Sequence, residues 1–514
     1  MYHAIIFSGI SQTRSLFFKP IGPYRIRTVL EENGYPTKVI DYYQFLIEEQ
    51  IEDYLDKYVS KETKWIGISA TFFKFPQHWR PNFWFRMKKK FPGVKIVIGG
   101  TTQYINQETP YADYVINGYG DDAVIALADH LSGKPVDLKY IVKGGTIYID
   151  GNKDYDVKDV SNIKTLWKKE DCIDSRMTMP IEIARGCIFR CAFCAFPKNG
   201  KKKFDYIRAK ESLEEEFIRN YEEHGITSYG FMDDTLNDSE HKIEMLYDVI
   251  TNLPFRISFD CYTKPELLYR WPDTIDMLCE AGMRGATLGI ESLNPRTRSI
   301  IAKGFDVDKV FEVLSRLKKA SNNRVKTQCN FIIGLPEESE QSIARTREIV
   351  NASPDIDQWM WYNLFLQDPS KVYYSSKMEE DPEKYGYRTT RDEKGYGGRP
   401  IVFWVTPTMN HKRAKELSEI YMREDTNRMR VGGWWCGGVE SLGLNLNDFY
   451  KEKRGQAVDL PIEQLTNQYN EYMNKYLEYN LGAQSKLGIN DLSFGLRYVT
   501  SAPDIRKSTL PHSY

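Results

Sequence analysis

Short apolar runs alternate with amphipathic helical patterns twice along this chain, and that alternation limits the folds open to it. Between residue 1 and about residue 135, the candidate strands are YHAIIFSG, PTKVIDY, KWIGISATF, VKIVIGG and YADYVINGYG. Helical patterns such as GPYRIRTVLEENGY and DDAVIALADHL lie between them. Strands joined by helices predict a mainly parallel sheet with helices on both faces, which is a doubly wound α/β domain.

A second alternation runs from residue 180 to about residue 370. Its candidate strands are IEIAR, SYGFMDD, RISFDCY, RGATLGIES, KTQCNFIIG and QWMWYNLFL. This series predicts a partial (β/α)6 barrel of the TIM type, with its chemistry at the carboxyl ends of the strands. The expected organisation is a Rossmann-like domain at 1–135, a linker with a hairpin at 136–178, the barrel at 179–375 and a mainly α C-terminal region at 376–514.

Composition argues against several classes of function. Lys plus Arg (70) nearly balance Asp plus Glu (71), so bulk charge does not indicate a nucleic-acid partner. No apolar run is long enough to span a membrane, and the N-terminus lacks the basic segment and cleavage site of a secretion signal. Five cysteines are scattered singly, which is not a disulfide framework: Cys172, Cys261, Cys279, Cys329 and Cys436. We expect a protein of the reducing cytoplasm.

The other three cysteines, Cys187, Cys191 and Cys194, form the pattern C-x3-C-x2-C in IARGCIFRCAFCAF. Three thiolates on one tight loop can hold three irons of a cubane [4Fe-4S] cluster and leave the fourth iron open. Zinc is the alternative, but a structural zinc site takes four closed ligands, and no nearby Cys or His completes a set. The spacing therefore predicts an iron–sulfur cluster with one open corner.

Because this loop follows the first barrel strand, the sequence resembles the radical S-adenosylmethionine (SAM) enzymes, and Phe193 in CAFC matches their aromatic residue before the last cysteine. The resemblance implies that the open iron binds SAM and that the reduced cluster cleaves it to a 5'-deoxyadenosyl radical. It also implies SAM contacts at three further strand ends. These are Asp233 and Asp234 after the second strand, Glu291 and Ser292 at the fourth, and Asn330, Ile332 and Gly334 in NFIIGLPEES at the fifth.

Some of these positions have simpler interpretations or depart from the family. One of the two aspartates could cap the next helix. Asn330 stands where the family usually has glycine, so it is either a polar contact or a tolerated strand residue. The sixth strand reads LFLQDPSKVYY where relatives often have P-x-PGT. That departure indicates a different substrate loop.

The N-terminal domain resembles that of the cobalamin-binding subgroup of radical SAM enzymes, through IGPYRIRTVLEENGYPTKVIDY, GISATF, VIGG and NGYGDDAV. The resemblance implies that a corrinoid lies along small residues at the strand ends, namely Ser69, Thr71, Gly99, Gly100 and Gly118. The D-x-H-x-x-G signature, which supplies a histidine to cobalt, is missing from residues 1–135. We therefore expect either cobalamin without a protein histidine beneath it, or a scaffold that has lost the cofactor.

The resulting hypothesis is a radical SAM enzyme that methylates an unactivated carbon of a small-molecule or peptide substrate. Its expected cofactors are the [4Fe-4S] cluster, SAM and cobalamin. An electron donor such as flavodoxin or ferredoxin is the expected partner. The alternatives are a cobalamin-independent radical SAM enzyme acting on a peptide, lipid or nucleotide, and a non-catalytic sensor. Two segments have open interpretations. Lys198 and Lys201 to Lys203 form a basic patch or a solvated loop, and GGWWCGG around Cys436 is a lid or a core plug.

Overall fold

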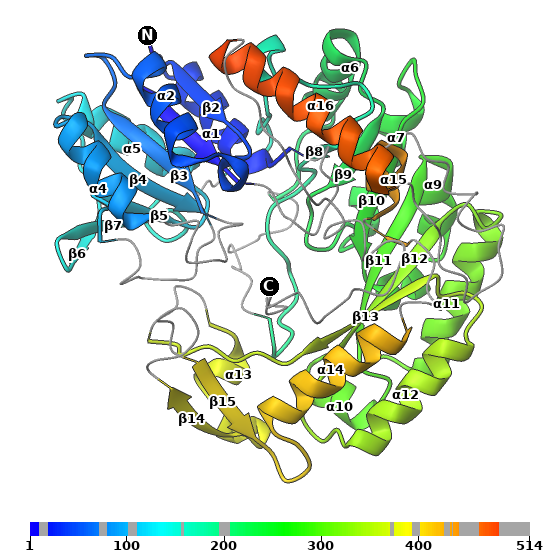
Figure 1. Ribbon diagram of the computed structural model, residues 1–514. Helices are drawn as coiled ribbons and strands as arrows, with labels where there is room; N and C mark the ends of the chain where they lie inside the picture. The colour runs from blue at the N-terminus through cyan, green and yellow to red at the C-terminus, as the bar shows by residue number, and fades with distance from the viewer. Residues whose placement is uncertain are drawn as a thin grey trace.

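The computed structural model describes residues 1–9, 19–70, 80–100, 110–155, 159–194, 206–370, 375–392, 401–425, 432–433, 435–441 and 462–482. Two α/β units lie side by side in it (Figure 1). The N-terminal unit is drawn in blue and cyan, and the larger unit forms a crescent in green and yellow. No helix of these described residues has the length and apolar composition needed to cross a membrane.

The N-terminal unit is built on a seven-stranded sheet with the strand order β2-β1-β3-β4-β5-β7-β6. The strands are β1 (Ala4–Ser8), β2 (Thr37–Ile40), β3 (Trp65–Ser69), β4 (Lys95–Gly100), β5 (Tyr114–Asn117), β6 (Ile141–Lys143) and β7 (Thr146–Asp150). All neighbours are parallel except β6 and β7, which form the expected hairpin. Because β7 pairs with β5, this hairpin extends the sheet beyond residue 135 instead of standing apart in a linker.

Helices cover both faces of this sheet. They are α1 (Ile21–Glu32), α2 (Glu48–Tyr58), α4 (Pro81–Lys90) and α5 (Asp121–Leu131). Helix α1 packs on α5, and Lys90 of α4 forms ion pairs with Glu52 and Asp56 of α2. Right-handed crossovers place these two helix pairs on opposite faces of a parallel sheet. The predicted doubly wound domain is confirmed.

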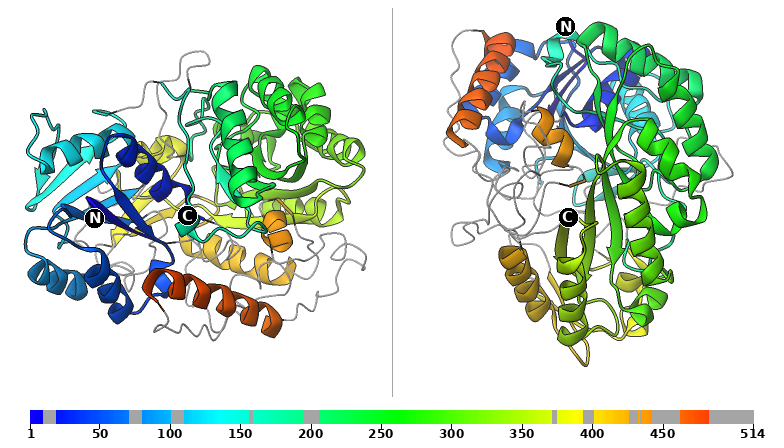
Figure 2. Two further views of the ribbon diagram at one scale, coloured as in Figure 1. Left: turned by 90° about the horizontal axis from the view of Figure 1, so that it is seen from above. Right: turned by 90° about the vertical axis from the view of Figure 1, so that its right-hand side faces the viewer.

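The larger unit is a parallel sheet whose six strands follow one another in chain order. They are β8 (Met179–Ile181), β9 (Ser228–Phe231), β10 (Ser258–Thr263), β11 (Met283–Glu291), β12 (Lys326–Ile333) and β13 (Gln358–Asn363). The intervening helices are α6 (Lys210–His224), α7 (Glu240–Thr251), α8 (Pro265–Arg270), α9 (Asp273–Glu280), α10 (Pro295–Ile300), α11 (Val307–Ala320) and α12 (Glu340–Ala352). Among the described strands β13 does not pair with β8, so the barrel is open, as Figures 1 and 2 show. The predicted partial barrel is confirmed.

The two faces of the barrel sheet differ in burial. Strand register places Asn330 beside Gly289 on one side and Met360 on the other. Gly289 and Asn330 are half-buried, whereas Cys329 and Phe331, which point to the opposite face, are almost fully buried. Because successive side chains of a strand alternate between faces, the helices cover the outer face and the inner face borders an open interior.

The C-terminal region contains α13 (Lys377–Glu380), β14 (Arg388–Asp392), β15 (Ile401–Val405), α14 (His411–Asp425), α15 (Trp435–Ser441) and α16 (Ile462–Leu481). The described residues also form three short 3-10 helices: η1 (Tyr43–Phe45), η2 (Lys169–Asp171) and η3 (Glu383–Tyr385). Helix α14 packs on the last barrel strand, where Asp425 accepts hydrogen bonds from the indoles of Trp359 (3.1 Å) and Trp361 (3.0 Å). The antiparallel pair β14–β15 adds a small sheet to a region that was expected to be mainly helical.

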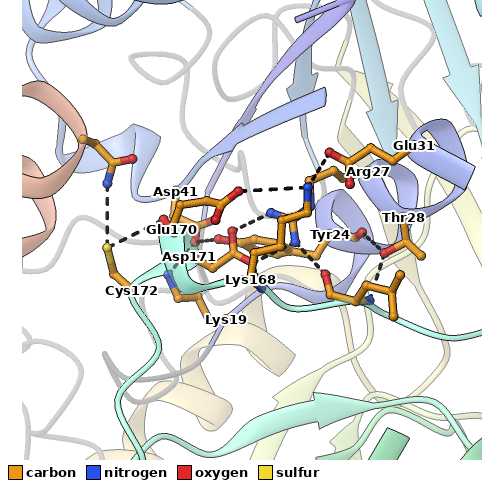
Figure 3. A network of polar contacts seen from close by, with 12 residues as sticks. Lys19, Tyr24, Arg27, Thr28, Glu31, Asp41, Lys168, Glu170, Asp171 and Cys172 are labelled. Atoms are coloured by element: carbon orange, nitrogen blue, oxygen red, sulfur yellow. Dashed lines mark hydrogen bonds and ion pairs between the residues drawn. The ribbon is translucent and has the colours of Figure 1, made fainter. Parts of the chain in front are cut away.

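A buried polar network ties the N-terminal unit to later parts of the chain (Figure 3). Lys19 forms a fully buried ion pair with Asp41 (2.9 Å), and the Tyr24 hydroxyl donates to the same carboxylate. Arg27 on α1 binds Asp171 through two nitrogens (2.5 and 2.8 Å). The segment that links the two units is therefore fixed along α1 by charged groups, which have little freedom to separate when they are buried.

Candidate functional site

The cysteine loop lies at the carboxyl edge of the barrel, directly after β8. Cys187, Cys191 and Cys194 are all half-buried. The backbone of Ala192, in the middle of the loop, donates to the Ile301 carbonyl (3.2 Å) and accepts from the Met378 amide (3.1 Å). The loop is therefore held from two sides, by the end of α10 and by the start of α13.

Asp233 supports the base of this loop. One carboxylate oxygen accepts hydrogen bonds from the backbone amides of Ile183 (3.0 Å) and Ala184 (3.1 Å), and the other pairs with Lys242 (3.1 Å). Burial raises the pKa of Asp233, while Lys242 and the two amides lower it. With its side chain only 3% exposed, Asp233 lies beneath the loop and contacts its backbone. Its neighbour Asp234 is half-buried and faces the N-terminal unit.

Two buried lysines that sequence reasoning missed lie beside the cysteines. The Lys264 ammonium stands 3.5 Å from the centre of the Phe189 ring, which belongs to the cysteine loop, and the residue is 8% exposed. No carboxylate or carbonyl of the described residues accepts a hydrogen bond from this ammonium. Burial lowers the pKa of Lys264, as does the nearby charge of Lys303, whereas Cys191 and Cys187 raise it. An ammonium beside the loop to which no described carboxylate or carbonyl is hydrogen-bonded fits an anionic group bound there.

Lys303 has a defined partner, Glu291. Its ammonium pairs with a Glu291 carboxylate oxygen (3.1 Å) and also donates to the Gly289 carbonyl. Glu291 ends β11 with a φ of 70°, the left-handed conformation that side chains other than glycine rarely adopt. The Glu291 carboxylate is thereby fixed at the strand end, next to the cysteine loop, because Lys303 also interacts electrostatically with Cys191.

Ser292 is joined to a buried acid that was not predicted as a site residue. Its hydroxyl donates to Glu338 (2.5 Å) and accepts from the backbone amide of Asn294 (3.0 Å). Burial raises the pKa of Glu338 to about 8, although the hydrogen bond from Ser292 acts in the opposite direction. Ser292 is 1% exposed, so this pair shapes the turn after β11 from within.

The predicted residues of β12 occupy two different environments. Asn330 and Ile332 are half-buried on the inner face, and Asn330 accepts a hydrogen bond from the Gln328 amide (2.9 Å). Gly334 has a φ of 98° and lies against Trp404, since a Cβ at this position would come within 2.4 Å of that indole. Gly334 therefore supports the strand end from behind. Phe193 is half-buried and packs on the main hydrophobic core.

Four of the five predicted corrinoid contacts lie together at the carboxyl edge of the N-terminal sheet, and Thr71 lies outside the described residues. Strand register places Ser69 beside Gly99, and Gly100 beside Asn117, the residue before Gly118. A Cβ added at Gly99 would meet no atom within 4 Å. The four residues are half-buried and the position of a Cβ on Gly99 is open, which fits a bound ligand that approaches the main chain closely.

The carboxyl edges of the two sheets meet. Tyr119 follows Gly118, and the guanidinium of Arg185, two residues before Cys187, stacks 4.6 Å from its ring centre. Burial raises the pKa of Tyr119, and the charge of Asp234 raises it further. The glycine edge of the first sheet and the cysteine loop of the barrel are therefore neighbours in space.

The GGWWCGG segment lies at the opposite, amino end of the barrel. The Gly432 and Gly433 amides donate to Gln358 (3.1 Å) and to the Lys326 carbonyl (3.1 Å), and the Gly437 amide donates to Asp260 (2.9 Å). Cys436 is fully buried. The described part of this segment is a plug at the end of the barrel that lies away from the cysteine loop.

In the described residues, no group of three or more His, Cys, Asp or Glu side chains is arranged to hold a single metal ion. A cubane cluster has different requirements, because each thiolate binds a separate iron. The half-buried cysteine loop, the unpaired Lys264 ammonium and the open inner face all fit such a cluster with an anionic ligand beside it.

Comparisons with known proteins agree with this geometry. Residues 181–350 match the family model of the radical SAM superfamily. The bacteriochlorophyllide d C-8(2)-methyltransferase of Chlorobaculum tepidum is 24% identical over 260 residues, which are 47% of this chain and 53% of that protein. The chain thus matches about half the length of this curated relative.

Solved structures extend the similarity to both units. The radical SAM methyltransferase TsrM of Kitasatospora setae, with cobalamin and a [4Fe-4S] cluster bound, has a TM-score of 0.64 and 15% identity, over 88% of this chain and 100% of that chain. The cobalamin-dependent SAM radical enzyme OxsB, with aqua-cobalamin and SAM bound, has a TM-score of 0.57 and 12% identity, over 93% of this chain and 72% of that chain. Residues 181–350 therefore form a radical SAM domain, and the chain has the fold of these two structures.

Proposed function

We propose that this protein is a cobalamin-dependent radical SAM methyltransferase that methylates an unactivated carbon. The observation that carries the proposal is the meeting of two ligand-binding edges. The half-buried cysteine loop of an open barrel lies beside the open glycine edge of a doubly wound sheet. Groups held at both edges would share one space, and direct transfer between them requires that closeness.

In this proposal, residues of both edges bind cofactors. Cys187, Cys191 and Cys194 would bind the cluster, Glu291 and Asn330 would contact SAM, and the edge formed by Ser69, Gly99, Gly100 and Gly118 would take the corrinoid. When bound, the cluster supplies the electron that cleaves SAM to a 5'-deoxyadenosyl radical, and cobalamin supplies a transferable methyl group. A substrate would lie along the inner face of the barrel sheet, between the two edges.

The cluster assignment is tested with protein reconstituted anaerobically with iron and sulfide. The wild-type chain should show the spectrum of a [4Fe-4S] cluster and form 5'-deoxyadenosine from SAM and a strong reductant. Cys191→Ala should form none, because one iron loses its ligand. Cys279→Ala removes a buried cysteine of α9, away from the loop, and should retain wild-type turnover. A Cys191→Ala variant with normal deoxyadenosine yield would contradict the assignment.

The cobalamin assignment has a separate test. After incubation with hydroxocobalamin and gel filtration, the folded wild-type protein should retain the visible absorbance of the corrinoid. Gly99→Leu fills the open space at the sheet edge and should abolish that retention while the cluster signal stays unchanged. If the wild-type protein retains no corrinoid but still cleaves SAM, it is a cobalamin-independent radical SAM enzyme.

We also propose a reducing, cytoplasmic setting and a small electron-donor protein such as flavodoxin or ferredoxin. Four cysteines are buried and form no disulfide bond within the described residues, which supports a reducing compartment: Cys261, Cys279, Cys329 and Cys436. The lysines at 198 and 201–203, expected to form a basic patch, lie outside the described residues. Reduced flavodoxin should be able to replace the chemical reductant. Mixed with the oxidised enzyme and SAM, it should support the formation of 5'-deoxyadenosine.

A further inference from the structure

A buried ionic group joins the two units at the place where their carboxyl edges meet. Arg185 donates to both carboxylate oxygens of Asp121 (2.7 and 3.3 Å) and to both oxygens of Glu182 (3.0 and 3.1 Å). Its guanidinium also lies over the Tyr119 ring. Arg185 and Asp121 are 3% and 5% exposed, so the pair is shielded from water.

Asp121 is held from the N-terminal side as well. Arg25 of α1 donates to it (2.6 Å) and also to the Lys164 carbonyl (2.7 Å). Burial alone would raise the pKa of Asp121, but Arg185 and Arg25 together hold it at about 2. The carboxylate is therefore charged at every working pH, and Arg185 always faces an anion across the interface.

The position of this pair in the sequence connects it to both proposed cofactor edges. Asp121 begins α5 directly after Gly118, Tyr119 and Gly120. Arg185 precedes Gly186, which has a φ of 73°, and then Cys187. The glycine loop packs closely on the segment after β7: the Tyr119 carbonyl would lie 1.9 Å from a Cβ at Gly151, and the Tyr119 amide donates to Asn152 (2.8 Å).

We propose that Arg185 and Asp121 are a positioning pair that sets the separation between the cysteine loop and the corrinoid edge. This inference rests on the proposed two-cofactor function. Transfer between two bound groups is sensitive to displacements of about 1 Å, and a two-point guanidinium–carboxylate contact fixes both distance and orientation. Lysine would keep the charge but could not bridge Asp121 and Glu182 while stacking on Tyr119.

The first test uses the full chain loaded with the cluster and with cob(II)alamin. Both groups are paramagnetic when the cluster is reduced, so electron paramagnetic resonance reports their dipolar coupling and hence their separation. The wild-type protein should show one defined splitting. Asp121→Asn and Arg185→Met should lose it through a broader distribution of distances, at unchanged cluster and corrinoid content, and Arg185→Lys should restore it only in part.

Asp425→Asn is the matched control, because Asp425 is a fully buried partner of Arg347 (2.9 and 3.1 Å) within the barrel, away from the interface. It should keep the wild-type splitting even if the protein becomes less stable. A wild-type splitting in both Asp121→Asn and Arg185→Met would overturn the proposal.

A second test needs no cofactor, so it distinguishes failure of this inference from failure of the proposed function. In hydrogen–deuterium exchange of the cofactor-free full chain, Asp121→Asn should speed exchange in two separate peptides, around residues 114–121 and around residues 181–187. Asp425→Asn should leave both unchanged. If Asp121→Asn affects only the peptide that contains the substitution, the pair does not couple the two loops. If the wild-type protein binds no corrinoid, the exchange result alone decides whether the two loops are coupled.

Discussion

Lys264 brings a positive charge to a buried position beside the cysteine loop, and its effect can be measured on the cluster itself. A unit charge within several ångströms at an effective dielectric of about 20 is worth a few kcal/mol. Lys264→Met should therefore lower the midpoint potential of the bound cluster by roughly 100 mV, because the reduced, more negative state loses a favourable neighbour. Spectroelectrochemistry measures this shift, and Lys264→Arg should stay close to the wild-type value. Equal potentials in Lys264→Met and wild type would exclude this role.

Glu338 predicts a pH dependence of stability. Burial raises its pKa from 4.5 to about 8, so the folded state keeps a proton that the unfolded state releases. The contribution of Glu338 to the free energy of unfolding is fully present below about pH 4.5, where both states are protonated. It is lost progressively as the pH rises to about 8. Relative to Glu338→Gln, the wild-type free energy of unfolding should fall by about 1.4 kcal/mol per pH unit across this range.

Urea unfolding at several pH values tests that expectation. Glutamine keeps the shape of the side chain and the oxygen that accepts from Ser292, so a change in slope reports the ionisable group. Parallel curves for the two proteins would show that Glu338 titrates normally in the folded state.

At the residue scale, the sequence showed the cysteines but not the side chains that fix their surroundings. The spacing of Cys187, Cys191 and Cys194 is local and therefore readable. Lys264, Lys303 and Glu338 act through contacts between different strand ends, which no local pattern encodes. A lysine directly after a barrel strand, as in DCYTKP, was the available signal for Lys264. The roles of Glu291, Asn330 and the glycine edge remain predictions.

The plug formed by residues 432–433 and 435–441 gives a prediction at the scale of one element. A Cβ at Gly285 would lie 2.2 Å from the Gly433 carbonyl oxygen and 2.5 Å from an Asp260 carboxylate oxygen. Gly285→Ala should therefore destabilise the protein by about 1–3 kcal/mol through overpacking. Gly93→Ala is the control, because a Cβ there meets no atom within 4 Å. Chemical denaturation compares the two variants, and equal midpoints would mean that the plug shifts to accommodate the added methyl group without loss of stability.

At the element scale, alternation in the sequence predicted the strands well, because each is a short apolar run between helices. Strand β12 was expected as KTQCNFIIG and spans Lys326–Ile333. The β14–β15 pair was missed, since its polar strand RTTRD is fully exposed and has no apolar face to give a pattern. The hairpin β6–β7 was expected, but its pairing with β5 depends on a contact that the local sequence does not reveal.

The network in Figure 3 gives a prediction at the scale of the whole molecule. Asp41 is fully buried, pairs with Lys19 and donates its backbone amide to Tyr476 of α16 (2.7 Å). Asp41→Asn should destabilise the protein by about 3–5 kcal/mol, because it leaves the Lys19 ammonium buried without a counter-charge. Asp56→Asn removes an exposed partner of Lys90 and should stay near the wild-type stability.

Thermal and urea unfolding compare these two variants, and a second measurement locates the effect. Asp41 and its neighbour Tyr42 are hydrogen-bonded to Tyr476 and Tyr472 of α16, so Asp41→Asn should also make α16 more sensitive to limited proteolysis. Wild-type cleavage in that variant would show that α16 is held independently of the ion pair.

The sequence predicted two α/β units, and the structure has them, but it could not predict how they face each other. That arrangement depends on single contacts such as Arg185 with Asp121, which are 64 residues apart. Patterns of apolar residues specify which face of an element is buried. They do not specify which charged side chains will meet between two separately folded sheets.

The late position of the plug and of α16 has a consequence for how the protein is made. A chain emerging from the ribosome completes its last barrel strand at Asn363, well before residues 432–441 and 462–482 are synthesised. Until those residues emerge, Asp260 and Gln358 lack their glycine amides, and Asp41 lacks Tyr476. A nascent chain that has completed only its last barrel strand therefore lacks buried partners in both units at once.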